Sequence, residues 1–356
     1  MIDRAEDVLE ERPVPTMLHI LNGDSTRGSL EQSGVPGTMA TWADVLHDGH
    51  VPPFDVGADR WRQVRAQFIA DQGWASYEDA LATFRQWDAA IDRYSEYDEA
   101  VIWCEHDLFD QLLLIRHLAW FAAHDLGRTT LALICIGEWP GRPHFKGLGE
   151  LAPSDLASLL GTRQRVTQRQ LELGRRAWRA FTGDDPRAIE RLIQQEDMTS
   201  LPFLAGALKR LLEEYPSVRD GLVRTDRQLL ELIAQGKTQL TDLFVANHAL
   251  ESNYFIGDSS FIARLRRLAR GLDALVRLDE GSDQWWTTGT VQLMGQGRAI
   301  LAGRGNWVRL AGIDEWRGGV HLQGNDAEWR WDADAQRLRG RGGADDVRSS
   351  GVRGAG

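Results

Sequence analysis

Short apolar runs and longer amphipathic stretches alternate along the N-terminal part of the chain. Four apolar runs have the length of a strand: Met17–Asn22, Thr38–Trp42, Ala100–Cys104 and Leu131–Ile136. Runs that are apolar throughout are typical of strands buried on both faces of a parallel sheet. Apolar residues at helical spacing predict helices over residues 25–32, 60–97 and 107–124, with Gly73 dividing the second stretch into two. We therefore expect an α/β domain with a mainly parallel, Rossmann-like sheet and right-handed crossover helices.

The rest of the chain is predicted to be helical first and mixed afterwards. Helical spacing predicts helices over residues 153–160, 167–181, 186–195 and 201–214. A winged-helix-like order then follows, with helices over 225–234, 241–249 and 260–270, strands over 274–278 and 290–294, and a short helix near 297–301. Alternation around Gly324-Asn325 and Asp332–Asp334 predicts closing β-hairpins. We expect three parts, 17–152, 153–222 and 223–340, with disorder at 1–16 and 341–356.

Composition and charge exclude several classes of partner. The chain has 356 residues and a net charge of −11, which argues against general affinity for nucleic acid or anionic membranes. From Gly257 onward there are 15 Lys/Arg against 13 Asp/Glu, so any contact with nucleic acid would belong to the tail. The two cysteines, Cys104 and Cys135, lie in apolar runs and indicate buried thiols in a reducing compartment. With no apolar run of membrane-spanning length and no signal peptide, we expect a soluble cytoplasmic protein.

Polar residues follow three of the predicted strands, where parallel sheets bind their ligands. The Gly/Pro-rich loop over residues 137–150 is a predicted wall or lid of the same region. We expect a base, His47, oriented by Asp44, which shares its face on a helical turn. The catalytic candidates are Asp24, Ser25, Asp44, His47, His106 and Asp107. The ligand-binding candidates are Asn22, Gly23, Trp42, Glu105, Gln111, Trp139 and His144.

Simpler explanations exist for several of these residues. Asp24 or Ser25 can cap the helix that they begin, and Asp107 suits the N-cap of the helix after the third strand. Asp110, in the first turn of that helix, is favoured by the helix dipole. The Asp44–His47 pair is also compatible with a surface turn before Pro52-Pro53.

Two motif comparisons concern residues 22–25, which follow the first predicted strand. Gly23-Asp24-Ser25 resembles the opening block of the Gly-Asp-Ser hydrolases, in which the serine is the nucleophile, but the remaining blocks of that family are missing. Backbone N–H groups of residues 24–27 would suit a phosphate, although neither known glycine-rich phosphate loop is present. Metal binding by Asp24, His47, His106 and Asp107 is conceivable without a diagnostic spacing. Metal and cofactor therefore stay open.

The third helix of the tail carries a basic face. Its apolar residues, such as Phe261 and Leu265, are expected to be buried, which leaves the arginines to meet phosphates or solvent. These nucleic-acid candidates are Arg264, Arg266, Arg267 and Arg270. A solvated basic face is the favoured explanation, a protein-docking or structural module also fits, and nucleic-acid binding is not favoured.

Several ordered blocks resemble one bacterial family, the one named for domain of unknown function 1835. They are HILNGDS at 19–25, WADVLHDGHVP at 42–52, VIWCEHDLFDQL at 101–112, FKGLGEL at 145–151 and EEYPSVRDGL at 213–222, and IDEWRGGVHLQG (313–324) and WRWD (329–332) resemble tails of its members. The resemblance implies no reaction, cofactor or catalytic residue.

The sequence therefore leaves three functional hypotheses. The first is an α/β domain that binds a small polar ligand, phosphorylated or nucleotide-like, and acts as a hydrolase or transferase at the strand ends. The second is a regulatory or adaptor protein whose winged-helix-like tail binds nucleic acid or a protein. The third is a Gly-Asp-Ser-type esterase.

Overall fold

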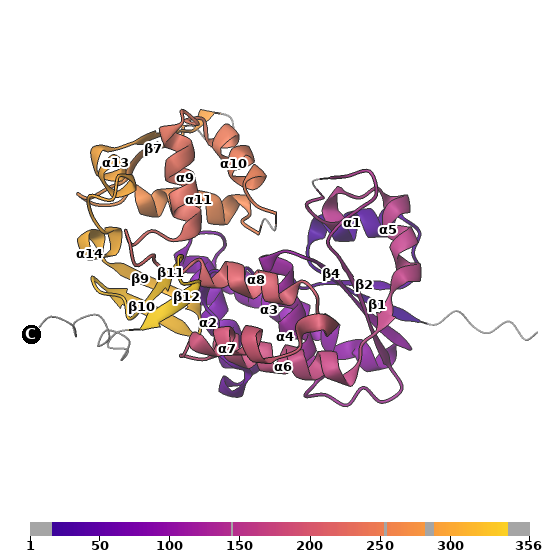
Figure 1. Cartoon of the computed structure of the whole chain (residues 1–356). Coiled ribbons are helices and arrows are strands. Elements are labelled where there is room, and N and C mark those ends of the chain that lie inside the picture. The colour runs from indigo at the N-terminus through magenta and orange to yellow at the C-terminus, as the bar shows by residue number, and fades with distance from the viewer. Residues whose placement is uncertain (1–15, 144, 253–254, 282–287, 341–356) are drawn as a thin grey trace, which may run out of the picture.

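A five-stranded sheet forms the centre of the N-terminal part (Figure 1). The computed structural model describes residues 16–143, 145–252, 255–281 and 288–340. The strands are β1 (Met17–Leu21), β2 (Thr38–Thr41), β4 (Glu99–Glu105), β5 (Thr130–Ile136) and β6 (Gln164–Arg165), in the order β2-β1-β4-β5-β6. The first four run parallel, and β6 is antiparallel to β5. The predicted α/β class with a mainly parallel sheet is confirmed.

Both faces of this sheet are apolar because successive side chains of a strand point to opposite sides. Val101 and Trp103 pack beneath α1 (Asp24–Gln32) and α5 (Pro153–Leu159). The alternate residues Ile102 and Cys104 belong to the larger core on the other face, which includes α4 (Leu108–Phe121). Each helix layer thus shields one face of the strands.

Helices that precede and follow α4 in the chain share its apolar core. They are α2 (Ala58–Asp71), α3 (Tyr77–Asp92), α6 (Gln168–Thr182), α7 (Arg187–Gln195) and α8 (Leu204–Leu212). Gly73, with φ of 71°, divides the predicted 60–97 stretch between α2 and α3. Gly174 of α6 lies against Leu118 of α4, where a Cβ atom would approach the leucine Cβ to 2.4 Å. A side chain at this glycine would separate the two helices.

The tail follows the predicted order of helices and strands. Its elements are α9 (Arg224–Ala234), α10 (Leu240–Ala249), α11 (Asp258–Leu268), β7 (Val276–Asp279), β8 (Thr290–Leu293), α13 (Gly295–Leu301), α14 (Trp307–Ala311), β9 (Ile313–Gly318), β10 (Val320–Gly324), β11 (Trp329–Asp332) and β12 (Arg337–Gly340). Strands β7–β8, β9–β10 and β11–β12 form antiparallel pairs. The predicted turn near Asp332 lies at the β11–β12 hairpin.

One predicted hairpin turn is wrong. Strands β9 and β10 turn at Gly318-Gly319, because Arg317 pairs with Val320, and Gly324-Asn325 follows the second strand instead. Gly318 has φ of 59°, and a Cβ atom there would come within 2.1 Å of the Phe181 carbonyl oxygen. The turn thus needs glycine both for its backbone conformation and for its contact with α6.

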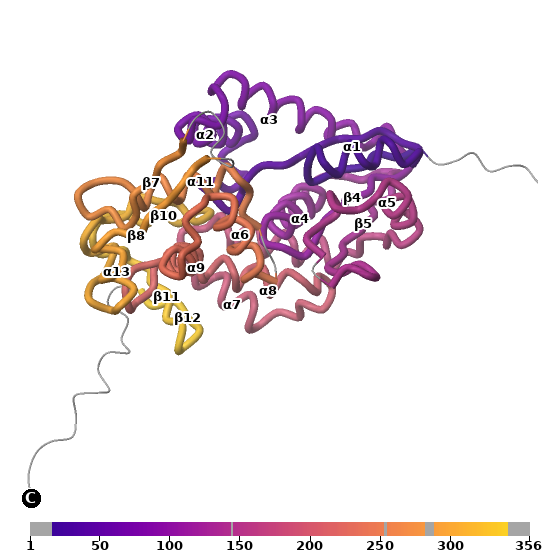
Figure 2. Tube along the Cα trace, turned by 90° about the horizontal axis from the view of Figure 1, so that it is seen from above, coloured from indigo at the N-terminus to yellow at the C-terminus, as the bar shows by residue number. Residues whose placement is uncertain are grey.

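The N-terminal part of the chain and the tail meet in a small second sheet. Strand β3 (Gly49–His50) pairs in parallel with β9, and in Figure 2 the tail, in orange and yellow, lies at the opposite end of the molecule from α1, β4 and β5. One continuous apolar core contains residues of all three predicted parts, so the boundaries between those parts stay predictions. Thr16, expected to be disordered, bonds to Asp98, whereas residues 1–15 and 341–356 lie outside the described residues.

Within the described part of the chain, no helix has both the length and the apolar character needed to cross a membrane.

Candidate functional site

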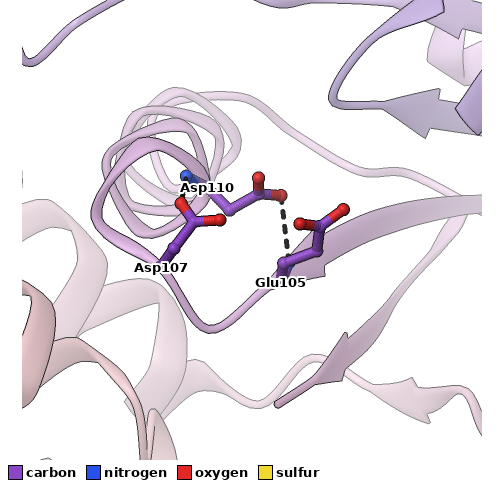
Figure 3. Close-up of side chains that lie close together, drawn as sticks. All are labelled: Glu105, Asp107 and Asp110. Atoms are coloured by element: carbon purple, nitrogen blue, oxygen red, sulfur yellow. Dashed lines mark hydrogen bonds between the residues drawn. The ribbon is translucent and has the colours of Figure 1, made fainter. Parts of the chain in front are cut away.

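Three carboxylates meet where β4 passes into α4 (Figure 3). Glu105 ends the strand, Asp107 is the N-cap of the helix, and Asp110 lies in its first turn. An oxygen of each lies within 4.8 Å of the others, and all three residues are buried. The sequence therefore brings three acids into one buried group within six consecutive residues.

Hydrogen bonds inside the connection hold these acids in place. Asp107 Oδ1 accepts the backbone N–H of Asp110 at 2.9 Å, which confirms that Asp107 caps the helix. Asp110 Oδ1 in turn accepts the backbone N–H of Glu105 at 2.9 Å. The cap and the return bond close a tight connection, so the carboxylates are fixed by the backbone rather than by flexible side chains.

Asn22, at the end of β1, reaches the same group from the neighbouring strand. Its Nδ2 donates to Glu105 Oε1 at 2.9 Å and to both carboxylate oxygens of Asp110 at 3.0 Å. Its Oδ1 is buried and has no hydrogen-bond partner. Strands β1 and β4 are also where the chain's connections diverge toward opposite edges of the sheet, the position at which open α/β sheets bind ligands.

No cationic side chain among the described residues compensates the three acids. Burial and the charges of Asp110 and Asp107 raise the pKa of Glu105 well above its usual value. Burial and Asp110 do the same to the pKa of Asp107, and burial raises the pKa of Asp110 to about 6. The donors to the cluster are neutral amides, so its negative charge favours protonation or a bound cation.

The predicted wall contributes backbone to this site. Leu148 donates its N–H to Glu105 Oε1 at 2.6 Å. Gly147, with φ of 154°, lies so close that a Cβ atom would be 2.0 Å from Glu105 Oε2. Trp139 instead packs, half-buried, on the apolar cluster of the sheet, and His144 lies outside the described residues. The contact comes from the backbone of the FKGLGEL block.

Asp24 and Ser25 begin α1 at the same edge and are exposed. The N-cap of α1 is Gly23, and no side chain caps the helix, so the capping explanation for Asp24 and Ser25 is wrong. Asp24 Oδ1 accepts a bond from Thr41 at 3.4 Å, and Ser25 lies against Gly149. Neither side chain belongs to the acidic group found among the described residues.

Trp42 does not line the edge of the sheet. It is fully buried, donates its indole N–H to Asp88 at 3.0 Å and carries the Arg116 guanidinium 4.0 Å above its ring. The expectation that Trp42 faces a ligand was wrong because the apolar ring turns into the core beneath α3.

Asp44 and His47 do not form the expected pair. Asp44 accepts two bonds from Arg65, at 2.7 and 2.8 Å, and both side chains are fully buried. His47 lies on a turn rather than a helix, and neither of its ring nitrogens has a hydrogen-bond partner. Its nearest acid is Asp48 at 3.4 Å, and burial lowers its pKa. Asp44 therefore cannot orient His47, and Ser25 forms no dyad with it.

His106 and Gln111 lie on either side of the β4 end. His106 packs on Phe145 and Phe203, and its Nε2 is 3.1 Å from the Ser252 carbonyl oxygen. It does not belong to the group of acids found among the described residues. Gln111 donates its side-chain N–H to the Glu105 carbonyl oxygen at 2.6 Å, so it binds the last residue of the strand.

The tail helix presents fewer arginines than expected. Arg264 is buried and pairs with Glu214 at 2.8 Å, and Arg267 pairs with Asp226 and Glu315. The structure contradicts the alternative in which these two face phosphates, because acids from other segments surround α11. Arg266, paired with Glu280, and Arg270 are exposed.

Asp110 is the functional candidate that sequence reasoning missed. It was explained by the helix dipole, which favours acids in the first turn. The signal that identifies it is the spacing Glu105-x-Asp107-x-x-Asp110, since a capping acid and an acid three residues later share one side of a helix start.

No protein-family model matches this chain, and no curated protein matches it.

Proposed function

We propose that the carboxyl edge of the sheet binds a small polar ligand, phosphorylated or nucleotide-like, and performs hydrolysis or group transfer on it. The observation that carries the proposal is that Asn22 bonds to two of three buried acids between β1 and β4, for which the described part of the chain offers no cationic partner. Buried acids with raised pKa values are typical of catalytic sites, where they transfer protons near neutral pH.

The start of α1 supports an anionic group in the ligand. The first N–H groups of a helix have no partner within the helix and lie at the positive end of its dipole, so they favour phosphate. A Cβ atom at Gly23 would meet no other atom within 4 Å, so the backbone is open to an approaching ligand there. Ser25 and Asp24 lie at the same helix start.

The acids can divide the work of hydrolysis. A carboxyl group that stays protonated, such as Glu105 or Asp107 with their strongly raised pKa values, would give its proton to the leaving oxygen. An ionised neighbour, Asp110 above about pH 6, would accept a proton from the attacking water. Asn22 would hold the carboxylates in position through the bonds that it already donates.

The finer description of the fold belongs to the same proposal. We assign the sheet to a Rossmann-like class because of its strand order, and the tail to a winged-helix-like class because α9–α11 precede the β7–β8 hairpin. The resemblance to the family of domain 1835 stays a prediction as well. A nucleic-acid function of the tail has less support, because Arg264 and Arg267 are engaged in internal ion pairs.

A thermal-shift screen tests the proposed function. Wild-type protein is screened against nucleotides, sugar phosphates and their dephosphorylated counterparts, together with Asn22→Ala and Glu99→Gln. Glu99 is a matched control, since it lies at the opposite end of β4 and pairs with Arg163. We expect a phosphorylated compound to stabilise wild-type and control protein and to lose its effect on the Asn22 variant. Equal stabilisation of all three proteins would place the ligand elsewhere.

A further inference from the structure

We propose that Glu105, Asp107 and Asp110 bind one hard divalent cation of the Mg²⁺ or Mn²⁺ class, with the Asn22 side-chain oxygen beside it. The cation would lie at the edge already assigned to a ligand, and its role in chemistry rests on that proposed function. Its binding is a separate property that can be measured without any ligand.

The geometry of the acids suits a single ion. Their nearest oxygens lie within 4.8 Å of one another, and Figure 3 shows the three side chains grouped at the junction of strand and helix. Metal–oxygen bonds of about 2.0–2.6 Å place two oxygens of one coordination sphere up to roughly 4–5 Å apart. A cation among these oxygens therefore requires only small side-chain movements.

Asn22 gives an independent indication of a ligand. It is 9% exposed, its amide nitrogen contacts two of the acids, and its Oδ1 has no donor. A buried polar atom without a partner is unfavourable by about 1–3 kcal/mol. A cation, or a water molecule bound to it, would satisfy this oxygen at the edge of the acidic cluster.

Other buried acids of this chain have an arginine. Asp44 is held by Arg65, and Glu214 by Arg210 and Arg264. The acidic cluster receives only neutral bonds, from Asn22 and from backbone N–H groups. The folded protein thus pairs its buried carboxylates with cationic side chains elsewhere, and at the β4–α4 junction a free cation can take that role.

The donor set selects the class of cation. Carboxylate and amide oxygens suit Mg²⁺, Mn²⁺ and Ca²⁺, whereas histidine and thiolate ligands would favour zinc or copper. The described group contains no histidine or cysteine. Mg²⁺ commonly keeps several waters and binds through a few carboxylates together with a substrate phosphate. Such a cation would face a phosphate placed at the start of α1.

Titration of the full-length protein with MnCl₂ after chelator treatment tests the inference, with free Mn²⁺ followed by electron paramagnetic resonance. We expect one Mn²⁺ per chain, competed by MgCl₂. Glu105→Gln and Asp110→Asn should each weaken binding at least roughly tenfold, since even outer partners of a metal site contribute 10–100-fold. Glu99→Gln should bind as the wild type does. Circular dichroism and thermal unfolding confirm that each variant is folded.

Two results would overturn the inference. One is the lack of saturable binding at roughly millimolar Mn²⁺, the weak end of protein sites for such cations. The other is unchanged binding in both cluster variants. If a phosphorylated ligand binds equally well in chelator and no Mn²⁺ binding is found, the cation inference is refuted and the proposed function is not affected. Mn²⁺ binding lost in the variants supports the cation even when no ligand is found.

Discussion

Replacing Asp110 with asparagine removes one of three buried charges that no cationic side chain of the described residues offsets. Burial raises the pKa of Asp110 from 3.8 to about 6, so the folded protein holds this proton more tightly than the unfolded chain does. That contribution to stability is fully present below about pH 4 and is lost as the pH rises through about 6. Asparagine does not ionise, so the variant lacks this particular loss of stability, while Glu105 and Asp107 titrate in both proteins.

The pKa difference of about two units corresponds to roughly 3 kcal/mol, at about 1.4 kcal/mol per unit. About 2 kcal/mol of this stabilisation is lost between about pH 4.5 and about pH 8, the range chosen for the assay. With an unfolding entropy of roughly 2 cal/mol/K per residue, a chain of 356 residues that unfolds in one transition would show a change of about 3 °C in Tm. Changes in hydrogen bonding shift the variant equally at every pH and cancel from this difference.

The assay compares thermal unfolding of wild-type and Asp110→Asn protein in chelator across this pH range. We expect the variant to gain about 3 °C on the wild type toward high pH. Glu99→Gln serves as the control, because Glu99 pairs with Arg163 at the other end of the strand. A difference in Tm that is constant with pH would refute the reasoning, because Asp110 would then be ionised without penalty.

Three further substitutions test the corrected structure. Arg65→Met leaves Asp44 buried without its partner and should lower the unfolding free energy by about 3–5 kcal/mol in urea titrations; a loss under about 1 kcal/mol would contradict this ion pair. Arg264→Met leaves Glu214 with Arg210 as its remaining cationic partner, so it should destabilise by less than Arg65→Met, and affinity for DNA at low salt should not change. Gly147→Ala adds a Cβ atom against the acidic cluster and strains the backbone by roughly 1–3 kcal/mol; it should weaken Mn²⁺ binding, and unchanged affinity would mean that this loop is not part of the site.

The sheet was predictable because its signal is local. Apolar runs and helical spacing each depend on neighbouring residues, and the structure confirms the strands and most helices to within a few residues. The same locality placed Glu105 and Asp107 at the end of one strand and Asn22 at the end of another, and the structure brings Asn22 into contact with Glu105. Their contact follows from parallel pairing of β1 and β4, which fixes which strand ends are neighbours.

The errors arise where a distant partner decides the role of a side chain. Asp44 has the right spacing for His47, but an arginine 21 positions away offers a stronger, bidentate contact. Arg264 lies on the polar side of an amphipathic helix, and acids of the middle segment and the tail turn that side into an interior. Charge complementarity across long sequence separations has no periodic signature, so the sequence does not reveal it.

The short pairing of β3 with β9 has a consequence for the order in which this protein is made. The backbone of Gly49 and His50 obtains its strand partner only after Arg317 and Gly318 have been synthesised. Asp48, just before this strand, likewise accepts a hydrogen bond from Ser260, which is synthesised much later. Domains form as the chain leaves the ribosome from its N-terminus, but long-range pairing is slow and leaves edges unprotected. Nascent or prematurely terminated chains would therefore carry an open strand edge beside a finished sheet, a natural target for chaperones and proteases.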